Sequence, residues 1–231
     1  MILVPYRPDS DRRDRLWNFT RSWLEQHHPD YPIYLGSSPD GPFNRSAAIN
    51  HAAKDAGEWD VAVICDSDTV VPPAQLDKAI RDAHETGLLA SALTKVVELS
   101  KKSTNRLLAD SQTDILTLNK IRTRRKEDMT QSSAIAVPRT LWDAIGFDEG
   151  FCGWGCEDNA FWIAATLLGG AGRGRPTRGE PLRVNGAAYH LWHEKASKIK
   201  LFDPVFRTNF KRLRHYKKAK TPDQLALLCG V

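Results

Sequence analysis

The run Val61-Ala62-Val63-Ile64-Cys65-Asp66-Ser67-Asp68 contains the strand around which we expect the rest of the chain to be organised. Its first five residues are apolar without a break, which is typical of a strand buried on both faces of a sheet. Side chains two residues apart in an extended chain point the same way, so Asp66 and Asp68 would share one face at the carboxyl end of this strand. In open α/β sheets that end is where ligands bind.

The spacing of Asp66 and Asp68 leaves two interpretations open. Two neighbouring carboxylates repel each other unless a cation lies between them, and oxygen ligands suit Mg2+ or Mn2+. An isolated Asp-x-Asp is also a common turn after a strand. The other motifs of the chain have to decide between a metal site and an ordinary turn.

Apolar and helical patterns alternate along the first part of the chain. Strands are predicted at 2–5, 31–35, 61–65, 88–93, 134–137, 182–184 and 187–191. Helices are predicted at 11–27, 44–56, 73–86, 139–145 and 157–168. This alternation predicts an α/β protein with a mainly parallel central sheet flanked by helices.

Three segments fall outside this alternation. Residues 94–129 are polar and charged, and they are long enough for a strand pair or a mobile loop. Residues 169–181 are rich in Gly, Arg and Pro, which predicts a flexible surface loop. The tail from about residue 204 is predicted to be helical and basic.

The bulk composition is that of a soluble globular protein of 231 residues with a net charge of +5. The positive excess lies in runs at 122–126 and 211–220, which suit an anionic partner but are also typical of solvated surface. No apolar run approaches the ~20 residues of a membrane span, and no signal peptide is evident at the start. The four cysteines lack the spacing of a disulfide framework, so we expect free thiols and a cytoplasmic location.

Two basic motifs lie where a nucleotide could bind. Pro5-Tyr6-Arg7 follows the first strand, and its arginine fork suits a phosphate while its tyrosine could border a base. Phe43-Asn44-Arg45 precedes a helix of small residues, so Arg45 would lie in a first turn that favours anions. A capping asparagine beside a surface arginine is the plainer interpretation.

The motif Gly153-Trp154-Gly155-Cys156-Glu157-Asp158 suggests an acceptor site. A tryptophan between two glycines is a poor core residue and a good platform for a sugar. Either of the following acids could act as a general base. Acids in a first helical turn also stabilise the helix with no catalytic role, by ~0.3–1 kcal/mol.

The motif His190-Leu191-Trp192-His193 adds two imidazoles. They would point to opposite faces of a strand, whereas a turn would bring both inward. Together with carboxylates they fit Mn2+ or another transition metal better than Mg2+. A competing zinc site would join these histidines to Cys152 and Cys156, although the spacing is atypical.

These five motifs, taken in chain order, resemble the metal-dependent glycosyltransferases of the GT-A fold, in particular the β-1,4-galactosyltransferases and the polypeptide N-acetylgalactosaminyltransferases. The resemblance implies a single Rossmann-like GT-A domain at 1–200. A nucleotide-binding half would lie at 1–93 and an acceptor and metal half at 130–195. Residues 201–231 would form a basic helical C-terminal tail.

The resemblance also implies roles for the motif residues. The nucleotide and donor site would be lined by Pro5, Tyr6, Arg7, Phe43, Arg45 and Asp66. Mn2+ (or Mg2+) would be held by Asp68, Asp66, His193 and His190. The sugars would contact Trp154 and Gly155, and the catalytic pair would be Glu157 and Asp158, with Asp158 as the base of an inverting reaction.

The expected function is transfer of a sugar from a nucleotide-sugar, with a UDP-sugar as the expected donor, to the hydroxyl of a glycan, protein, lipid or nucleic acid. A sugar nucleotidyltransferase is the first alternative, but the segment after the first strand has no glycine in Arg7-Pro8-Asp9-Ser10. A non-catalytic module that binds nucleotide, glycan or nucleic acid through the basic tail is the second.

Overall fold

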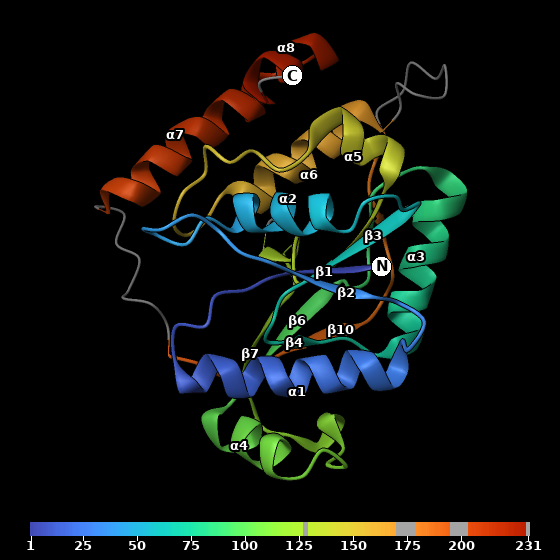
Figure 1. Cartoon of the computed structure of the whole chain (residues 1–231), viewed down its shortest axis with the longest axis vertical. Helices are drawn as coiled ribbons and strands as arrows, with labels where there is room; N and C mark the ends of the chain where they lie inside the picture. The colour runs from blue at the N-terminus through green and yellow to red at the C-terminus, as the bar shows by residue number, and fades with distance from the viewer. Residues whose placement is uncertain (127–128, 170–178, 195–202, 230–231) are drawn as a thin grey trace.

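The computed structural model describes residues 1–126, 129–169, 179–194 and 203–229, and a six-stranded sheet runs through its centre (Figure 1). The sheet order is β2-β1-β3-β8-β5-β9. Its strands are β1 (Ile2–Pro5), β2 (Ile33–Gly36), β3 (Val61–Cys65), β5 (Ala90–Ser91), β8 (Ala134–Pro138) and β9 (Leu182–Arg183). Only β8 runs antiparallel to its neighbours β3 and β5, so the predicted α/β class with a mainly parallel sheet is confirmed.

The helices that connect these strands begin and end close to their predicted bounds. They are α1 (Asp11–His27), α2 (Arg45–Asp55), α3 (Pro73–Thr86), α5 (Arg139–Ile145) and α6 (Glu157–Leu168). Local chemistry explains the ends: the side chain of Ser10 caps α1, that of Asn44 caps α2, and Gly87 ends α3 in the left-handed region.

The sheet separates two hydrophobic cores. Along β3, Ala62 and Ile64 face the core formed with α2, α5 and α6, whereas Val63 and Cys65 face the core formed with α1 and α3. This two-residue alternation explains why the strand is apolar throughout, as a strand covered on both faces must be.

A second sheet, which the sequence analysis did not predict, lies against α1 (Figure 1). Its order is β4-β10-β6-β7, with bounds β4 (Thr69–Val70), β6 (Lys95–Leu99), β7 (Lys120–Arg124) and β10 (Ala187–His190). Strands β6 and β7 are the strand pair that was one expectation for 94–129. Helix α4 (Lys101–Ala109) and the 3-10 helix η1 (Ile115–Thr117) lie between them in the chain and were not predicted.

The basic C-terminal segment is helical as predicted, forming α7 (Pro204–Lys218) and α8 (Pro222–Cys229). Leu213 and Tyr216 are buried in the core that contains α6, and the side chains of Arg212 and Tyr216 both donate to Asp148. The two helices are therefore packed into the domain. The predicted boundary near residue 200 and most of the predicted loop at 169–181 lie outside the described residues.

None of the helices in the described ranges is long and apolar enough to cross a membrane.

Gly36, the last residue of β2, marks the closest contact between the sheet and α2. A Cβ atom there would lie 1.7 Å from the carbonyl oxygen of Ala48, and backbone on both sides leaves little room to move. Because overpacking of this kind is costly, we expect Gly36→Ala to lower the free energy of unfolding by about 3 kcal/mol, measured by urea unfolding. Leu35→Ala, at an exposed neighbouring position, is the control. An unchanged midpoint for Gly36→Ala would contradict this packing.

Candidate functional site

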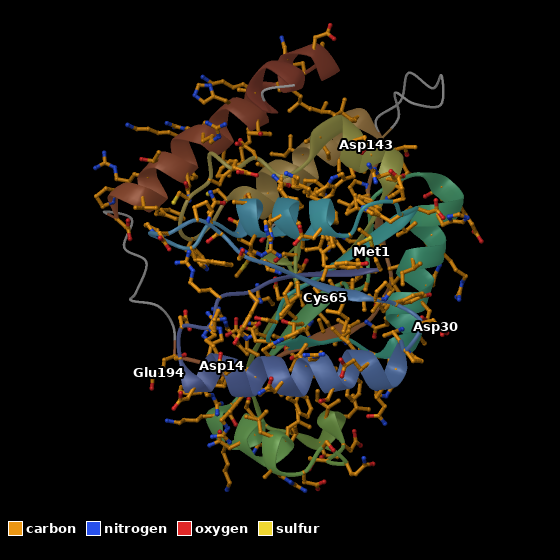
Figure 2. The ribbon with its side chains drawn as sticks, viewed as in Figure 1. Met1, Asp14, Asp30, Cys65, Asp143 and Glu194 are labelled. Atoms are coloured by element: carbon orange, nitrogen blue, oxygen red, sulfur yellow. The ribbon has the colours of Figure 1, made fainter. Side chains whose placement is uncertain are left out.

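Asp68 lies where the two sheets meet. After β3 the chain turns through Asp66 and enters β4, which pairs antiparallel with β10 so that Thr69 lies opposite His190. The backbone N–H of Leu191 donates to the carbonyl oxygen of Asp68 at 2.8 Å. Figure 2 shows Cys65, the end of β3, near the middle of the molecule. The pairing of β4 with β10 thus brings the histidine motif to the carboxyl end of β3.

Asp68, His190 and His193 form a cluster that could hold a metal ion. The Nε2 atom of His190 lies 3.6 Å from Asp68 Oδ1, and that of His193 lies 3.3 Å from Asp68 Oδ2. One potential ligand atom from each residue lies within 4.8 Å of the others. The turn after β10 therefore brings both histidines to one carboxylate, which an extended strand would not do.

The charge of Asp68 is fixed by its surroundings. Its side chain is buried, which disfavours the ionised form, but His190, His193 and the guanidinium of Arg13 at 3.0 Å outweigh this and lower its pKa below the ordinary range. The hydrogen bond to Asp68 raises the pKa of His193. Arg13, on the first turn of α1, was not predicted because nothing in the local sequence indicates that α1 points at β3.

Helices α1 and α4 hold the segment between the two histidines. The backbone N–H of Trp192 donates to Thr104 at 2.8 Å, and its carbonyl oxygen accepts from the guanidinium of Arg12 at 2.8 Å. The cationic groups of Arg12 and Lys101 lie over the Trp192 ring at 5.4 and 4.8 Å from its centroid. Sequence reasoning missed this anchor, since it joins residues about 90 and 180 positions apart.

The competing zinc site, in which Cys152 and Cys156 would join the two histidines, is not assembled. The only cluster of potential metal ligands in the described part of the chain contains no cysteine. The thiol of Cys152 points instead to the carbonyl oxygen of Pro42, 3.9 Å away.

Arg45 links the two acidic motifs. Its guanidinium donates to Asp158 at 2.6 Å and to Asp66 at 2.8 Å, which ties the carboxyl end of β3 to the start of α6. Burial disfavours the charged guanidinium, but the adjacent carboxylates outweigh it and raise the pKa of Arg45. The structure thus places Asp66 with Arg45 and Asp158, outside the cluster of Asp68 and the histidines.

Glu157 and Asp158 open α6 and are held in conditions that favour the protonated form. Burial, followed by the charge of Asp158, raises the pKa of Glu157 to about 7. Burial also raises the pKa of Asp158, although Arg45 acts in the opposite direction. The Glu157 carboxyl can therefore exchange protons near neutral pH.

The loop Gly153–Cys156 presents Trp154 to solvent. Gly153 and Gly155 have positive φ angles of 69° and 97°, a region that glycine adopts without a steric penalty. The backbone N–H of Gly153 donates to the carbonyl oxygen of Phe43, so the loop lies beside the Phe43-Asn44-Arg45 motif. The Trp154 side chain is 64% exposed.

The side chain of Asn209 on α7, which was not predicted, binds the backbone of this loop. It is 2% exposed, and its side-chain amide lies 2.9, 3.4 and 3.0 Å from the carbonyl oxygens of Cys152, Trp154 and Gly155. An asparagine within a basic helix gave no signal of this contact in the sequence.

Tyr6 and Arg7 of the Pro5-Tyr6-Arg7 motif contact different parts of the protein. Arg7 lies over the Phe43 ring, 5.3 Å from its centroid, and donates to Ser38, Pro39 and Gly41 at 2.7, 2.8 and 2.6 Å. The Tyr6 hydroxyl donates to Asp14 of α1, and its ring packs on Trp17. The structure therefore brings Arg7 and Phe43 together, while Tyr6 turns toward α1 and Pro5 ends β1.

Comparison with solved structures identifies the fold. The chain is similar to a β-1,4-galactosyltransferase 7 variant from Drosophila, solved with manganese, UDP-Gal and xylobiose, with a TM-score of 0.50 and 17% identity. The similarity covers 96% of this chain and 82% of that one. The chain has the GT-A fold.

A second solved structure is also similar. This is the glucosyl-3-phosphoglycerate synthase of Mycobacterium tuberculosis in complex with phosphoglyceric acid, with a TM-score of 0.47 and 13% identity over 100% of this chain and 79% of that one. The sequence itself matches no protein-family model and no curated protein. The GT-A fold predicted from the five motifs is confirmed by the first structure, and the roles of the motif residues remain predictions.

The raised pKa of Glu157 makes stability depend on pH. Unfolding lowers this pKa from about 7 to its ordinary 4.5, so the folded state binds the extra proton and loses stability as pH rises through that window. Glu157→Gln cannot ionise, so it should not lose this stability. We expect its free energy of unfolding, relative to that of wild type, to rise by about 1–3 kcal/mol from pH 5 to pH 8. Urea unfolding at both pH values measures this. If the difference in free energy of unfolding between Glu157→Gln and wild type were the same at both pH values, the raised pKa of Glu157 would be contradicted.

Proposed function

We propose that this protein is a metal-dependent glycosyltransferase that transfers a sugar from a nucleotide-sugar, with a UDP-sugar as the expected donor, to an acceptor hydroxyl. The observation that carries the proposal is the convergence of Asp68, His190 and His193 at the carboxyl end of β3 in a GT-A fold. The Drosophila enzyme of similar fold was solved with manganese and UDP-Gal, which supports the same donor chemistry here.

The proposed metal site fits Mn2+ by the nature of its donors. One carboxylate and two imidazoles are a mixed oxygen and nitrogen set, which suits Mn2+ better than Mg2+. Asp68, His190 and His193 would hold the ion, and Asp66 would act beside it through Arg45. When bound, a divalent cation offsets the negative charge that develops on the leaving diphosphate.

The donor would lie between the first two motifs. Arg7 and Phe43 form a cationic and aromatic edge, and Arg45 places a half-buried positive charge between that edge and the metal cluster. We propose that the nucleotide binds along Pro5, Tyr6, Arg7 and Phe43. Arg45 would then hold Asp66 and Asp158 in place next to the donor sugar.

Asp158 is proposed as the base of an inverting transfer. The acceptor hydroxyl gives its proton to the Asp158 carboxylate as its oxygen forms a bond to the anomeric carbon. The bond from that carbon to the diphosphate breaks, and its electron pair leaves with the phosphate oxygen. Arg45 keeps Asp158 oriented, Glu157 lies buried behind it, and Trp154 and Gly155 border the acceptor.

A thermal-shift panel tests this proposal. UDP-, GDP- and dTDP-sugars are each added with Mn2+ or with EDTA, because a ligand that binds only the folded state raises its stability. We expect a UDP-sugar to raise the melting temperature only when Mn2+ is present. Nucleotide binding that is indifferent to Mn2+ and EDTA would overturn the proposal and favour a non-catalytic binding module.

The compartment is also a proposal. Cys65, Cys152 and Cys156 are free thiols in the described part of the chain, which fits a reducing compartment such as the cytoplasm.

A further inference from the structure

An exposed aromatic strip leads away from the proposed acceptor loop along α7. We call Trp154, Phe206 and Phe210 the α7 platform. The rings of Trp154 and Phe206 lie 6.2 Å apart, and those of Phe206 and Phe210 lie 6.3 Å apart, with interplanar angles of 30° and 20°. Trp154 and Phe210 are 64% and 44% exposed, and no other aromatic side chain within the described ranges is exposed to this degree. Phe206, which is half-buried, links the two exposed rings, so the strip runs from the proposed acceptor loop onto α7.

Positive charges cover the exposed part of α7, and Arg214 adjoins the platform. The exposed cationic residues of this helix are Arg207, Lys211, Arg214, Lys217 and Lys218. The guanidinium of Arg214 lies 5.7 Å from the Phe210 ring centroid, so charge and aromatic surface are in contact. The acid that caps the helix, Asp203, is engaged with the backbone N–H groups of Val205 and Phe206. The surface is therefore complementary to a ligand that carries negative charges along its length.

The platform is held rigidly to the candidate site. Asn209 binds three carbonyl oxygens of the Trp154 loop, and the Phe206 ring lies against Gly155, 3.3 Å from where a Cβ atom there would be. One helical turn further on, Arg212 forms an ion pair with Asp148 at 2.6 Å. A ligand lying on the platform would therefore meet Asp158 in a fixed register, since Asp158 lies in the first turn of α6, four residues after Trp154.

We propose that the α7 platform extends the acceptor site and binds an anionic glycan, meaning a chain of sugars that carries carboxylate or phosphate groups. The inference rests on the proposed glycosyltransferase function and names its acceptor class. A glycan supplies all three features that the surface requires: a hydroxyl for Asp158, flat apolar faces for the aromatic rings, and negative charges for the cations of α7. Its successive sugars would lie on successive rings.

Binding of a defined probe tests the platform. The full-length protein is titrated with labelled oligogalacturonate, with a neutral cello-oligosaccharide of equal length, and with an oligothymidylate of similar charge. We expect the anionic glycan to bind more tightly than either, with an affinity that falls as salt rises. We expect Phe210→Ala to weaken its binding about tenfold, as loss of an aromatic anchor does, and the charge reversal Arg214→Glu, at the cation beside that ring, to weaken it by a similar factor.

Matched variants on another surface control for general effects. Ile121→Ala removes an exposed apolar side chain from β7, and Lys102→Glu reverses an exposed charge on α4. Both are expected to bind the probe like wild type. If the two platform variants also bind like wild type, or if the neutral glycan or the oligothymidylate binds as tightly as oligogalacturonate, the inference is overturned.

A parallel titration of a UDP-sugar with Mn2+ separates this inference from the proposed function. Donor binding that persists in variants with weakened probe binding supports both. If the protein binds the donor but the platform substitutions do not change its affinity for the probe, the proposed acceptor class is overturned. The glycosyltransferase proposal then still stands. If the platform substitutions weaken probe binding but the protein binds no nucleotide-sugar, the glycan-binding surface is supported and the proposed glycosyltransferase activity is overturned.

Discussion

Replacing Asp158 with asparagine is expected to lower the rate of sugar transfer by about 10²–10⁴-fold, the range that a general base contributes. Asparagine has nearly the shape of aspartate but cannot take the proton of the acceptor hydroxyl. Donor binding should change little, because in this account the nucleotide is held by Arg7, Phe43 and the metal cluster. Steady-state transfer kinetics and donor titration on the same preparation measure both quantities.

The control for Asp158→Asn is Asp143→Asn, which alters an exposed carboxylate of α5 that pairs with Arg139. This variant should transfer sugar like wild type. If Asp158→Asn retained a kcat close to that of wild type, the base would have to be another group, and Asp158 would serve only to hold Arg45.

Replacing Arg45 with methionine is expected to lower the free energy of unfolding by about 2–3 kcal/mol, less than the cost of about 3–5 kcal/mol for a fully buried ion pair because the Arg45 side chain is 14% exposed. Arg45 is the cation between Asp66 and Asp158, and Glu157 is buried beside them. Without it, carboxylates in a poorly solvated region face one another uncompensated. Urea unfolding at neutral pH measures the loss.

Arg21→Met is the matched control, since Arg21 pairs with Glu25 on the exposed side of α1 and such a pair contributes only about 0–1 kcal/mol. The loss in Arg45→Met should shrink as pH falls, because protonation removes the repulsion among the carboxylates. The double variant Arg45→Met, Asp158→Asn should recover part of the stability at neutral pH. A loss of the same size as that of Arg21→Met would mean that Arg45 does not hold the acidic cluster together.

Local pattern in the sequence was sufficient for most of the central fold. Strand β3 is apolar because both of its faces are covered, and helices such as α1 carry their caps in adjacent residues. The short strand β4 was not predicted, since its two residues give no period. The second sheet depends on the pairing of β10 with β4 and β6, which joins segments about 90 to 120 residues apart.

The candidate site shows the same division. Chemistry within one motif, such as Asp66 and Asp68 after a strand or two histidines three residues apart, could be recognised from the sequence alone. Arg13, Thr104 and Asn209 act across the fold on Asp68, Trp192 and the Trp154 loop, and each lies on a helix whose local pattern is ordinary. The sequence also did not predict that the two aspartates have different partners: Asp66 pairs with Arg45, and Asp68 pairs with the histidines.

Binding of Mn2+, followed by electron paramagnetic resonance in the presence of UDP, tests the central claim most directly, because the signal of free aqueous Mn2+ is lost as the ion is bound. Wild type and Asp68→Asn are titrated side by side, with Asp55→Asn at an exposed position of α2 as the control. We predict that wild type and the control bind Mn2+ with the same affinity and that Asp68→Asn, still folded, binds at least about tenfold more weakly. Equal Mn2+ affinity in all three proteins would contradict the metal site of Asp68, His190 and His193, and with it the proposed function.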